Sequence, residues 1–325
     1  MQRESGTISE ADADPGSWPA LQALFGADWR GPCPGIGLVM GDAFRWLERL
    51  PAHSVQAIVT DPPYALVEYE AKDHAKLRAG RGGVWRIPPA LDGAARSPVP
   101  RFTVLSARDR ARLDGFFRDF ATLALEVLAP GGHLVIASTP LLSSTCFAGL
   151  ESQGFEKRGE IIRLVQTLRG GDRPKGAEAE FAEVTVMPAS GWEPWGLFRK
   201  PLSEATVAAN LRRWGTGGLR RPSPAEPFRD VIPVGPTRAA ERRIAPHPSL
   251  KPQALMRQLV RAVLPLGTGI VLDPFAGGGS TLAAAAYLGY QAIGIELDPA
   301  YAVMAERAIP LLSAIKPALR SKKEP

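Results

Sequence analysis

The sequence predicts an α/β protein built on a doubly wound, mostly parallel sheet. In the last third of the chain, short apolar segments alternate with helical patterns, in the order strand, helix, strand, helix. Apolar residues make up 45% of the chain, an ordinary globular share. The 325 residues are enough to bury a large core without disulfides.

Composition excludes several classes of protein. Cys33 and Cys146 are too few for a disulfide framework or a thiolate cluster. The four histidines lie at no metal-ligand spacing, so we expect no metal site. No apolar run reaches the roughly 20 residues that span a bilayer, and the polar N-terminus has no signal core. We therefore expect a cytoplasmic protein with no membrane partner.

The elements of the first half follow from local pattern. Residues 1–35 lack periodicity, and we expect a flexible N-terminal arm. Strands are predicted at 36–40 and 55–60, with a short amphipathic helix between them. The second strand must stop at the two prolines that follow Asp61. Residues 66–112 are rich in Gly, Pro and Arg, which predicts a long mobile loop.

Further elements complete the chain. An apolar stripe over 116–128 predicts a helix, and 133–138 a buried strand. Two more strands are expected around 158–165 and 182–190. Between 199 and 251 the chain concentrates its basic excess, which is compatible with a nucleic-acid partner. Residues 314–325 read as a disordered tail.

A glycine loop lies between the strand that ends at Asp273 and the next helix. Its sequence is Phe275-Ala276-Gly277-Gly278-Gly279-Ser280, in which glycines allow close approach to a ligand and the helix N-terminus offers amide donors. Glu296 ends the next strand, where a carboxylate can bind ribose hydroxyls. The third glycine of the dinucleotide pattern is replaced by Leu282, so a shorter turn suited to S-adenosylmethionine is favoured. A tight turn without a ligand is the alternative.

The second motif is Asp61-Pro62-Pro63-Tyr64, at the carboxyl end of a predicted strand. Open α/β sheets bind ligands at that edge. The Asp61 carboxylate and the Pro62 carbonyl could accept the N–H groups of an exocyclic base amine, while the prolines fix the backbone. Tyr64 could stack on a base swung out of a helix. The alternative is a strand-ending turn with a surface tyrosine.

Together, DPPY at 61–64 and DPFAGGGS at 273–280 resemble the paired signatures of the DNA amino-methyltransferases. The catalytic motif precedes a basic stretch and then the cofactor loop, which resembles the circularly permuted β group. The resemblance implies a seven-stranded sheet with one antiparallel edge strand, S-adenosylmethionine as cofactor, double-stranded DNA as substrate, and a prokaryotic or phage-encoded enzyme. A homodimer and a cognate restriction enzyme are further partners that it allows.

The resemblance also implies a division of the chain and a role for individual residues. Residues 36–198 form the catalytic half, 199–246 the target-recognition region and 247–313 the cofactor half. The catalytic residues are Asp61, Pro62, Pro63 and Tyr64. The cofactor-binding residues are Asp42, Asp273, Phe275, Ala276, Gly277, Gly279, Glu296, His247, Ser249 and Lys251, of which the last three belong to a segment expected to close over the methionine end. The DNA-binding residues are Arg212, Arg213, Arg220, Arg221, Arg238, Arg242 and Arg243.

Adenine N6 is the expected target, because Asp-Pro-Pro-Tyr goes with adenine more often than with cytosine in the family that the chain resembles. Cytosine N4 is the alternative. A catalytically silent DNA-binding module, an RNA methyltransferase and a dinucleotide-dependent oxidoreductase are less favoured; the intact Asp61 argues against the first and Leu282 against the last.

Overall fold

The computed structural model describes residues 16–63, 106–169 and 173–316. Within them, one nine-stranded sheet has the order β1-β2-β9-β8-β3-β4-β6-β5-β7. The strands are β1 (Trp29–Cys33), β2 (Ile36–Met40), β3 (Val55–Thr60), β4 (Leu128–Ala137), β5 (Glu156–Arg169), β6 (Ser190–Arg199), β7 (Val231–Pro233), β8 (Ile270–Asp273) and β9 (Gln291–Glu296).

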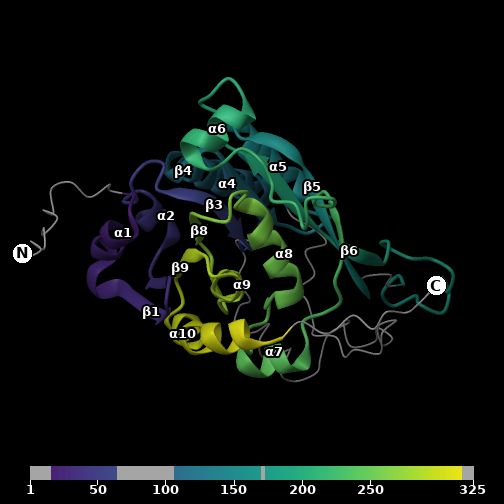
Figure 1. The fold of residues 1–325 in the computed structure, drawn as a ribbon. Helices are drawn as coiled ribbons and strands as arrows, with labels where there is room; N and C mark the ends of the chain where they lie inside the picture. The colour runs from purple at the N-terminus through teal and green to yellow at the C-terminus, as the bar shows by residue number, and fades with distance from the viewer. Residues whose placement is uncertain (1–15, 64–105, 170–172, 317–325) are drawn as a thin grey trace, which may run out of the picture.

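Helices cover both faces of this sheet (Figure 1). One face carries α8, α9 and α10, and the other carries α2, α4 and α5, each over its own apolar cluster. The helices are α1 (Trp18–Phe25), α2 (Ala43–Leu47), α4 (Ala107–Val127), α5 (Ser143–Ser152), α6 (Val207–Trp214), α7 (Ala239–Ile244), α8 (Gln253–Val263), α9 (Ser280–Leu288) and α10 (Pro299–Ala314). The doubly wound α/β fold is confirmed.

The sheet differs in detail from the expected seven strands with one antiparallel edge strand. The core from β2 through β9, β8 and β3 to β4 is parallel. The antiparallel strand β6 lies inside the sheet, between β4 and β5, because it returns from a hairpin that β5 begins. The described residues add two short strands, β1 at one edge and β7 at the other.

Part of the predicted N-terminal arm is ordered. Residues 18–33 form α1 and the antiparallel strand β1, in place of a flexible arm. The rings of Phe25 and Trp46 lie 4.8 Å apart, and those of Trp18 and Trp29 lie 5.2 Å apart. These aromatic contacts bury enough apolar surface to hold a segment that has no clear periodicity in sequence.

Two other predictions are wrong in their boundaries. The end of the predicted loop 66–112 belongs to α4, which the Ser106 side chain caps by accepting from the Asp109 amide. The strand expected at 182–190 begins only at Ser190. Val184 and Val186, which suggested it, are exposed and pair with no strand. Residues 64–105 lie outside the described part of the chain.

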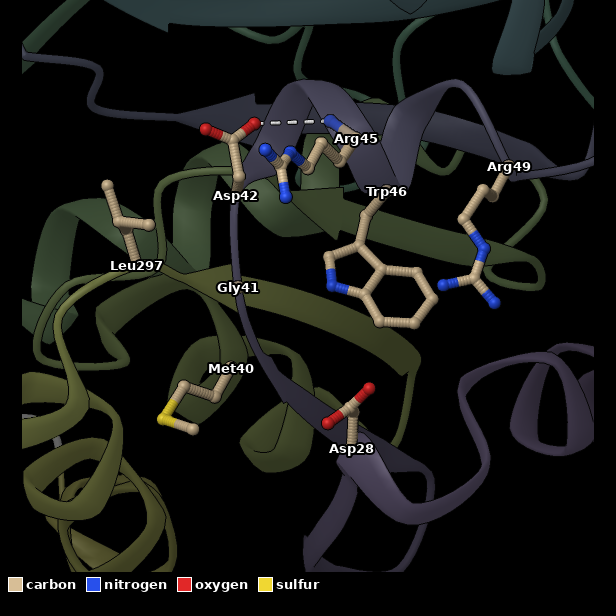
Figure 2. Close-up of a pocket in the computed structure, with 8 residues that line it drawn as sticks. All are labelled: Asp28, Met40, Gly41, Asp42, Arg45, Trp46, Arg49 and Leu297. Atoms are coloured by element: carbon tan, nitrogen blue, oxygen red, sulfur yellow. Dashed lines mark hydrogen bonds between the residues drawn. The ribbon is translucent and has the colours of Figure 1, made fainter.

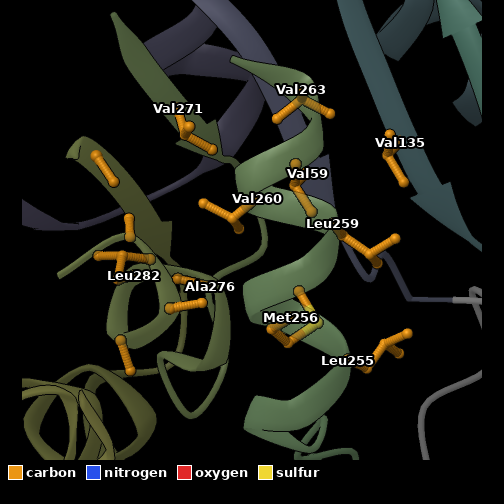
Figure 3. Close-up of a cluster of buried hydrophobic side chains, with 14 of the residues drawn as sticks. Val59, Val135, Leu255, Met256, Leu259, Val260, Val263, Val271, Ala276 and Leu282 are labelled. Atoms are coloured by element: carbon orange, nitrogen blue, oxygen red, sulfur yellow. The ribbon is translucent and has the colours of Figure 1, made fainter. Parts of the chain in front are cut away.

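Helix α8 shows why the core lies where it does (Figure 3). Leu255, Met256, Leu259, Val260 and Val263 recur with helical spacing on one face, and each is almost fully buried. They pack against valines of β3, β4 and β8. No helix in the described ranges is long and apolar enough to cross a membrane.

Replacing Leu259 with alanine tests this packing. Leu259 is 0% exposed, so the variant leaves a cavity between helix and sheet and should lose about 2–5 kcal/mol of unfolding free energy. Leu266, just beyond the helix, is 56% exposed, and Leu266→Ala should cost far less. Urea unfolding of both variants makes the comparison. Equal losses would show that α8 does not pack as described.

Candidate functional site

The two motifs that are far apart in sequence meet at one edge of the sheet. β3 and β8 are parallel neighbours, so their carboxyl ends bring Asp61 and the glycine loop together. The Thr60 hydroxyl donates to Asp273 Oδ1 at 2.7 Å, across a separation of 213 residues in sequence. This contact joins the end of β3 to the start of the glycine loop.

Asp273 fastens the glycine loop to the strand that precedes it. Its Oδ1 also accepts from the backbone amide of Phe275 at 3.2 Å. Burial raises the pKa of Asp273 to about 6, although hydrogen bonds from Thr281, Thr60 and Phe275 oppose the shift. Asp273 therefore stabilises the conformation of the glycine loop through hydrogen bonds to other groups of the protein.

The loop conformation requires glycine at two positions. Gly277 and Gly279 have φ values of 51° and 81°, in the left-handed region. A Cβ on Gly279 would lie 2.6 Å from Ile309 Cγ1, and one on Gly277 would lie 3.1 Å from His247 Cε1. Phe275 anchors the other end of the loop through ring contacts with Phe116 and Phe120 on α4.

Glu296 closes the loop from the next strand. Its Oε2 accepts from the Gly277 amide at 2.7 Å, and its Oε1 accepts from the Asp298 amide at 2.8 Å. Burial raises its pKa, against the effect of these amide donors. Each carboxylate oxygen has two lone pairs, so Glu296 can also accept from the hydroxyls of a ribose.

A pocket of about 480 Å³ opens at the carboxyl ends of β2 and β9, where Leu297, the residue after Glu296, forms part of its lining (Figure 2). Asp42 stands at one side, where its Oδ1 caps α2 by accepting from the amides of Phe44 and Arg45. The lining residues are Asp28, Met40, Gly41, Asp42, Arg45, Trp46, Arg49 and Leu297. The pocket offers polar and aromatic surface to a flat group.

The segment before α8 lies against the glycine loop. The ring of His247 contacts the ring of Tyr301 at a centroid distance of 4.4 Å. Burial lowers the pKa of His247 to about 4, so the imidazole is neutral at pH 7. Ser249 is exposed and donates its amide to His247 Nδ1. The backbone amide of Lys251 donates to Ser280 Oγ, which ties this segment to the start of α9.

The Lys251 side chain lies against Asp61, the first residue of the Asp-Pro-Pro-Tyr motif. Its Nζ is 2.7 Å from Asp61 Oδ2 and 3.0 Å from Glu193 Oε1. All three side chains are less than one sixth exposed. Burial pushes the pKa of Lys251 down, but the two carboxylates outweigh burial and raise it, so the ammonium stays charged. The sequence predicted Lys251 at the methionine end of a cofactor and did not predict this ion pair.

Glu193 and Arg163 belong to this site, and the motifs did not include them. Arg163 NH1 donates to Glu193 Oε2 at 2.8 Å. Each is a charged residue between two apolar neighbours, Trp192 and Pro194 for Glu193 and Ile162 and Leu164 for Arg163, which was the available signal. Pro62 is buried and Pro63 exposed beside Asp61. Tyr64 lies outside the described residues.

The seven predicted DNA-binding arginines fall into two groups at opposite ends of the molecule. Arg212 and Arg213 lie on α6, whose Asn210 binds the Pro130 carbonyl near the start of β4. Arg220 donates to the Tyr290 hydroxyl, just before β9 begins, and Arg221 follows it. Arg238, Arg242 and Arg243 lie on or beside α7, at the end of the molecule opposite α6 (Figure 1).

Helix α7 is linked to α8 and α9 by hydrogen bonds. Glu241 accepts from the Gln253 amide at the start of α8, and the Gln253 side chain donates to the Ser280 carbonyl. The three arginines around α7 therefore share an edge with the site, whereas the four on and after α6 do not. In the described residues, 199–246 is not a separate body: it supplies α6, β7 and α7 to different parts of the fold.

Comparison with known proteins agrees with this arrangement. Residues 214–307 match a family model described as DNA methylase, for N6 and N4 methyltransferases. The chain is similar to the type II methyltransferase M2.DpnII of Streptococcus pneumoniae, with 23% identity over 84% of this chain and 88% of that protein. It is also similar to the putative methylase YubD of Escherichia coli, with 25% identity over 81% of this chain and 85% of that protein.

Solved structures share the fold. A putative DNA modification methylase of Thermus thermophilus, TTHA0409, superposes with a TM-score of 0.53 and 23% identity, over 85% of this chain and 95% of that one. The PvuII DNA methyltransferase, described as cytosine-N4-specific, gives a TM-score of 0.54 and 14% identity, over 87% and 88%. The family model and the curated relatives together support a DNA amino-methyltransferase, with the motif order of the β group, and the solved structures share its fold.

Proposed function

We propose that the protein transfers a methyl group from S-adenosylmethionine to the N6 amine of adenine in duplex DNA, with the base swung out of the helix. One observation carries this proposal. The Asp61 carboxylate stands at the end of β3, beside a glycine loop on the neighbouring strand β8, where it can meet an amine and a methyl donor together.

The cofactor fits the residues that are present. Glu296 can hold the ribose, and the pocket beside Asp42 can take the adenine. Bound S-adenosylmethionine supplies a methyl group on a positively charged sulfur. A structure of TTHA0409 is described as complexed with S-adenosyl-L-methionine, and one of M1.HpyAVI as a SAM complex, which supports the same cofactor here.

Asp61 and Pro62 act on the target amine. The lone pair of an exocyclic amine is delocalised into the base, so the nitrogen is a weak nucleophile. Accepting both of its N–H groups, by the Asp61 carboxylate and the Pro62 carbonyl, favours a tetrahedral nitrogen with its lone pair free. The nitrogen gains positive charge as it takes up the methyl group, and the negative Asp61 stabilises that charge until one proton has left the nitrogen for solvent. Stacking of the base on Tyr64 is part of the proposal.

Cytosine N4 is the second candidate target. The fold similarity to the PvuII enzyme, described as cytosine-N4-specific, supports it. Adenine is preferred because the motif reads Asp-Pro-Pro-Tyr.

For DNA contact, we propose Arg238, Arg242 and Arg243, since α7 adjoins the cofactor half. The names of relatives as type II methyltransferases support a role in a restriction-modification system.

The product identifies the reaction. Unmethylated genomic DNA is incubated with the protein and S-adenosylmethionine, digested to nucleosides and analysed by mass spectrometry. We expect N6-methyladenine. N4-methylcytosine would retain the cofactor and the residue roles but correct the target base. Absence of both, from protein that binds S-adenosylhomocysteine, would contradict DNA amino methylation.

Asp61→Asn should lower the rate of methyl transfer at least a hundredfold, because a neutral amide no longer stabilises charge on the amine. Binding of S-adenosylhomocysteine, measured by calorimetry, should change less than threefold, since Glu296 and the glycine loop are intact. Asp114→Asn is the matched control, because Asp114 forms an ion pair with Arg118 on the outer part of α4. Turnover of the Asp61 variant at the normal rate would remove Asp61 from the mechanism.

A further inference from the structure

Glu193 lies at the centre of a chain of charged groups that ends on the catalytic carboxylate. Its Oε1 is 3.0 Å from Lys251 Nζ, and Lys251 Nζ is 2.7 Å from Asp61 Oδ2. The Glu193 side chain is 14% exposed. Nothing in the cofactor loop or in the Asp-Pro-Pro-Tyr motif requires a second carboxylate here, so Glu193 needs an explanation of its own.

Arg163 holds Glu193 in place from the neighbouring strand. Besides its 2.8 Å contact with Glu193 Oε2, Arg163 donates to the carbonyls of Val234 and Gly235, immediately after β7. Its side chain is 5% exposed. A guanidinium with three acceptors in fixed positions is rigid, so the Glu193 carboxylate cannot swing away from Lys251.

The charges of these groups balance. Asp61 and Glu193 carry one negative charge each, and Lys251 and Arg163 one positive charge each. Without Glu193, the two cations Arg163 and Lys251 would remain with Asp61 as the one carboxylate of this set, and Lys251 would pair with Asp61 alone. An excess positive charge beside Asp61 opposes methylation, because the target nitrogen gains positive charge in that step.

We propose that Glu193 is a positioning residue that fixes the Lys251 ammonium beside Asp61 and balances its charge, so that the Asp61 carboxylate stays oriented and fully negative toward the target amine. This inference rests on the proposed function. It assigns Lys251 to the catalytic carboxylate, and it extends the site to β5 and β6, through residues that lie outside both motifs.

The test is the single-turnover rate of tritiated methyl transfer to unmethylated genomic DNA, with saturating S-adenosylmethionine. Glu193→Gln removes the charge and keeps the shape. We expect the rate to fall at least tenfold, while the dissociation constant of S-adenosylhomocysteine changes less than threefold. Glu193→Asp keeps the charge and should recover part of the rate. A purely structural role would not separate rate from binding in this way.

Glu156→Gln is the matched control. Glu156 forms an ion pair with Arg199 across the same two strands, at 2.6 Å, in the register Glu156↔Arg199 far along the strands from Glu193. We expect its rate to equal that of the wild type. If Glu193→Gln does not fold, Glu193→Asp and Arg163→Lys carry the test, and each should lower the rate at least threefold with unchanged binding.

The outcomes separate this inference from the proposed function. A wild-type protein that methylates no DNA would overturn both. An active wild type with a folded Glu193→Gln variant of equal rate would overturn the role of Glu193 alone. A variant that loses cofactor affinity in proportion to its rate would also overturn it, because Glu193 would then serve binding.

Discussion

The buried ammonium of Lys251 joins the parts of the site. Its side chain lies between Asp61, which follows β3, and Glu193 on β6, and its backbone amide donates to the Ser280 hydroxyl at the start of α9. A buried lysine is costly unless it is paired, so the two carboxylates must be present and correctly placed. The geometry of one charged group therefore couples the Asp61-Pro62-Pro63 segment, the end of the glycine loop and the antiparallel strand β6.

The glycine loop supplies the second constraint. Asp273 and Glu296 hold the loop from two parallel strands. Both carboxylates accept hydrogen bonds from backbone amides or hydroxyls of the protein. Groups of the protein itself thus hold the loop in a left-handed conformation at Gly277 and Gly279. Such preorganisation reduces the entropy that binding must overcome.

Local sequence pattern was enough to predict the elements that have strong hydrophobic periodicity or that end at proline or glycine residues. Strands 36–40 and 55–60 appear with those bounds, and the glycine loop lies between strand and helix as expected. Contacts between distant segments were not predictable in the same way. Helix α1 and strand β1 depend on aromatic packing onto α2, and the place of β6 depends on a hairpin partner.

Some residues of the candidate site could be predicted from the sequence and others could not. The motif residues were predictable because they occupy adjacent positions in the sequence, as Asp61 and Pro62 do. Glu193 and Arg163 act through pairing across strands, which sequence spacing does not reveal. The basic stretch 199–251 was one feature in sequence, yet its arginines separate to two ends of the molecule because α6 packs near the start of β4 and α7 near the start of α8.

A double-mutant cycle on the Asp61–Lys251 pair tests this account most directly. The unfolding free energies of Asp61→Asn, Lys251→Met and the double variant are measured in urea. Each single variant leaves one buried charge without its partner, which lowers the unfolding free energy. The sum of the two single-variant losses should therefore exceed the loss in the double variant by about 1–3 kcal/mol. Additivity to within about 0.5 kcal/mol would contradict the account, since it would mean that the two groups do not interact in the folded protein.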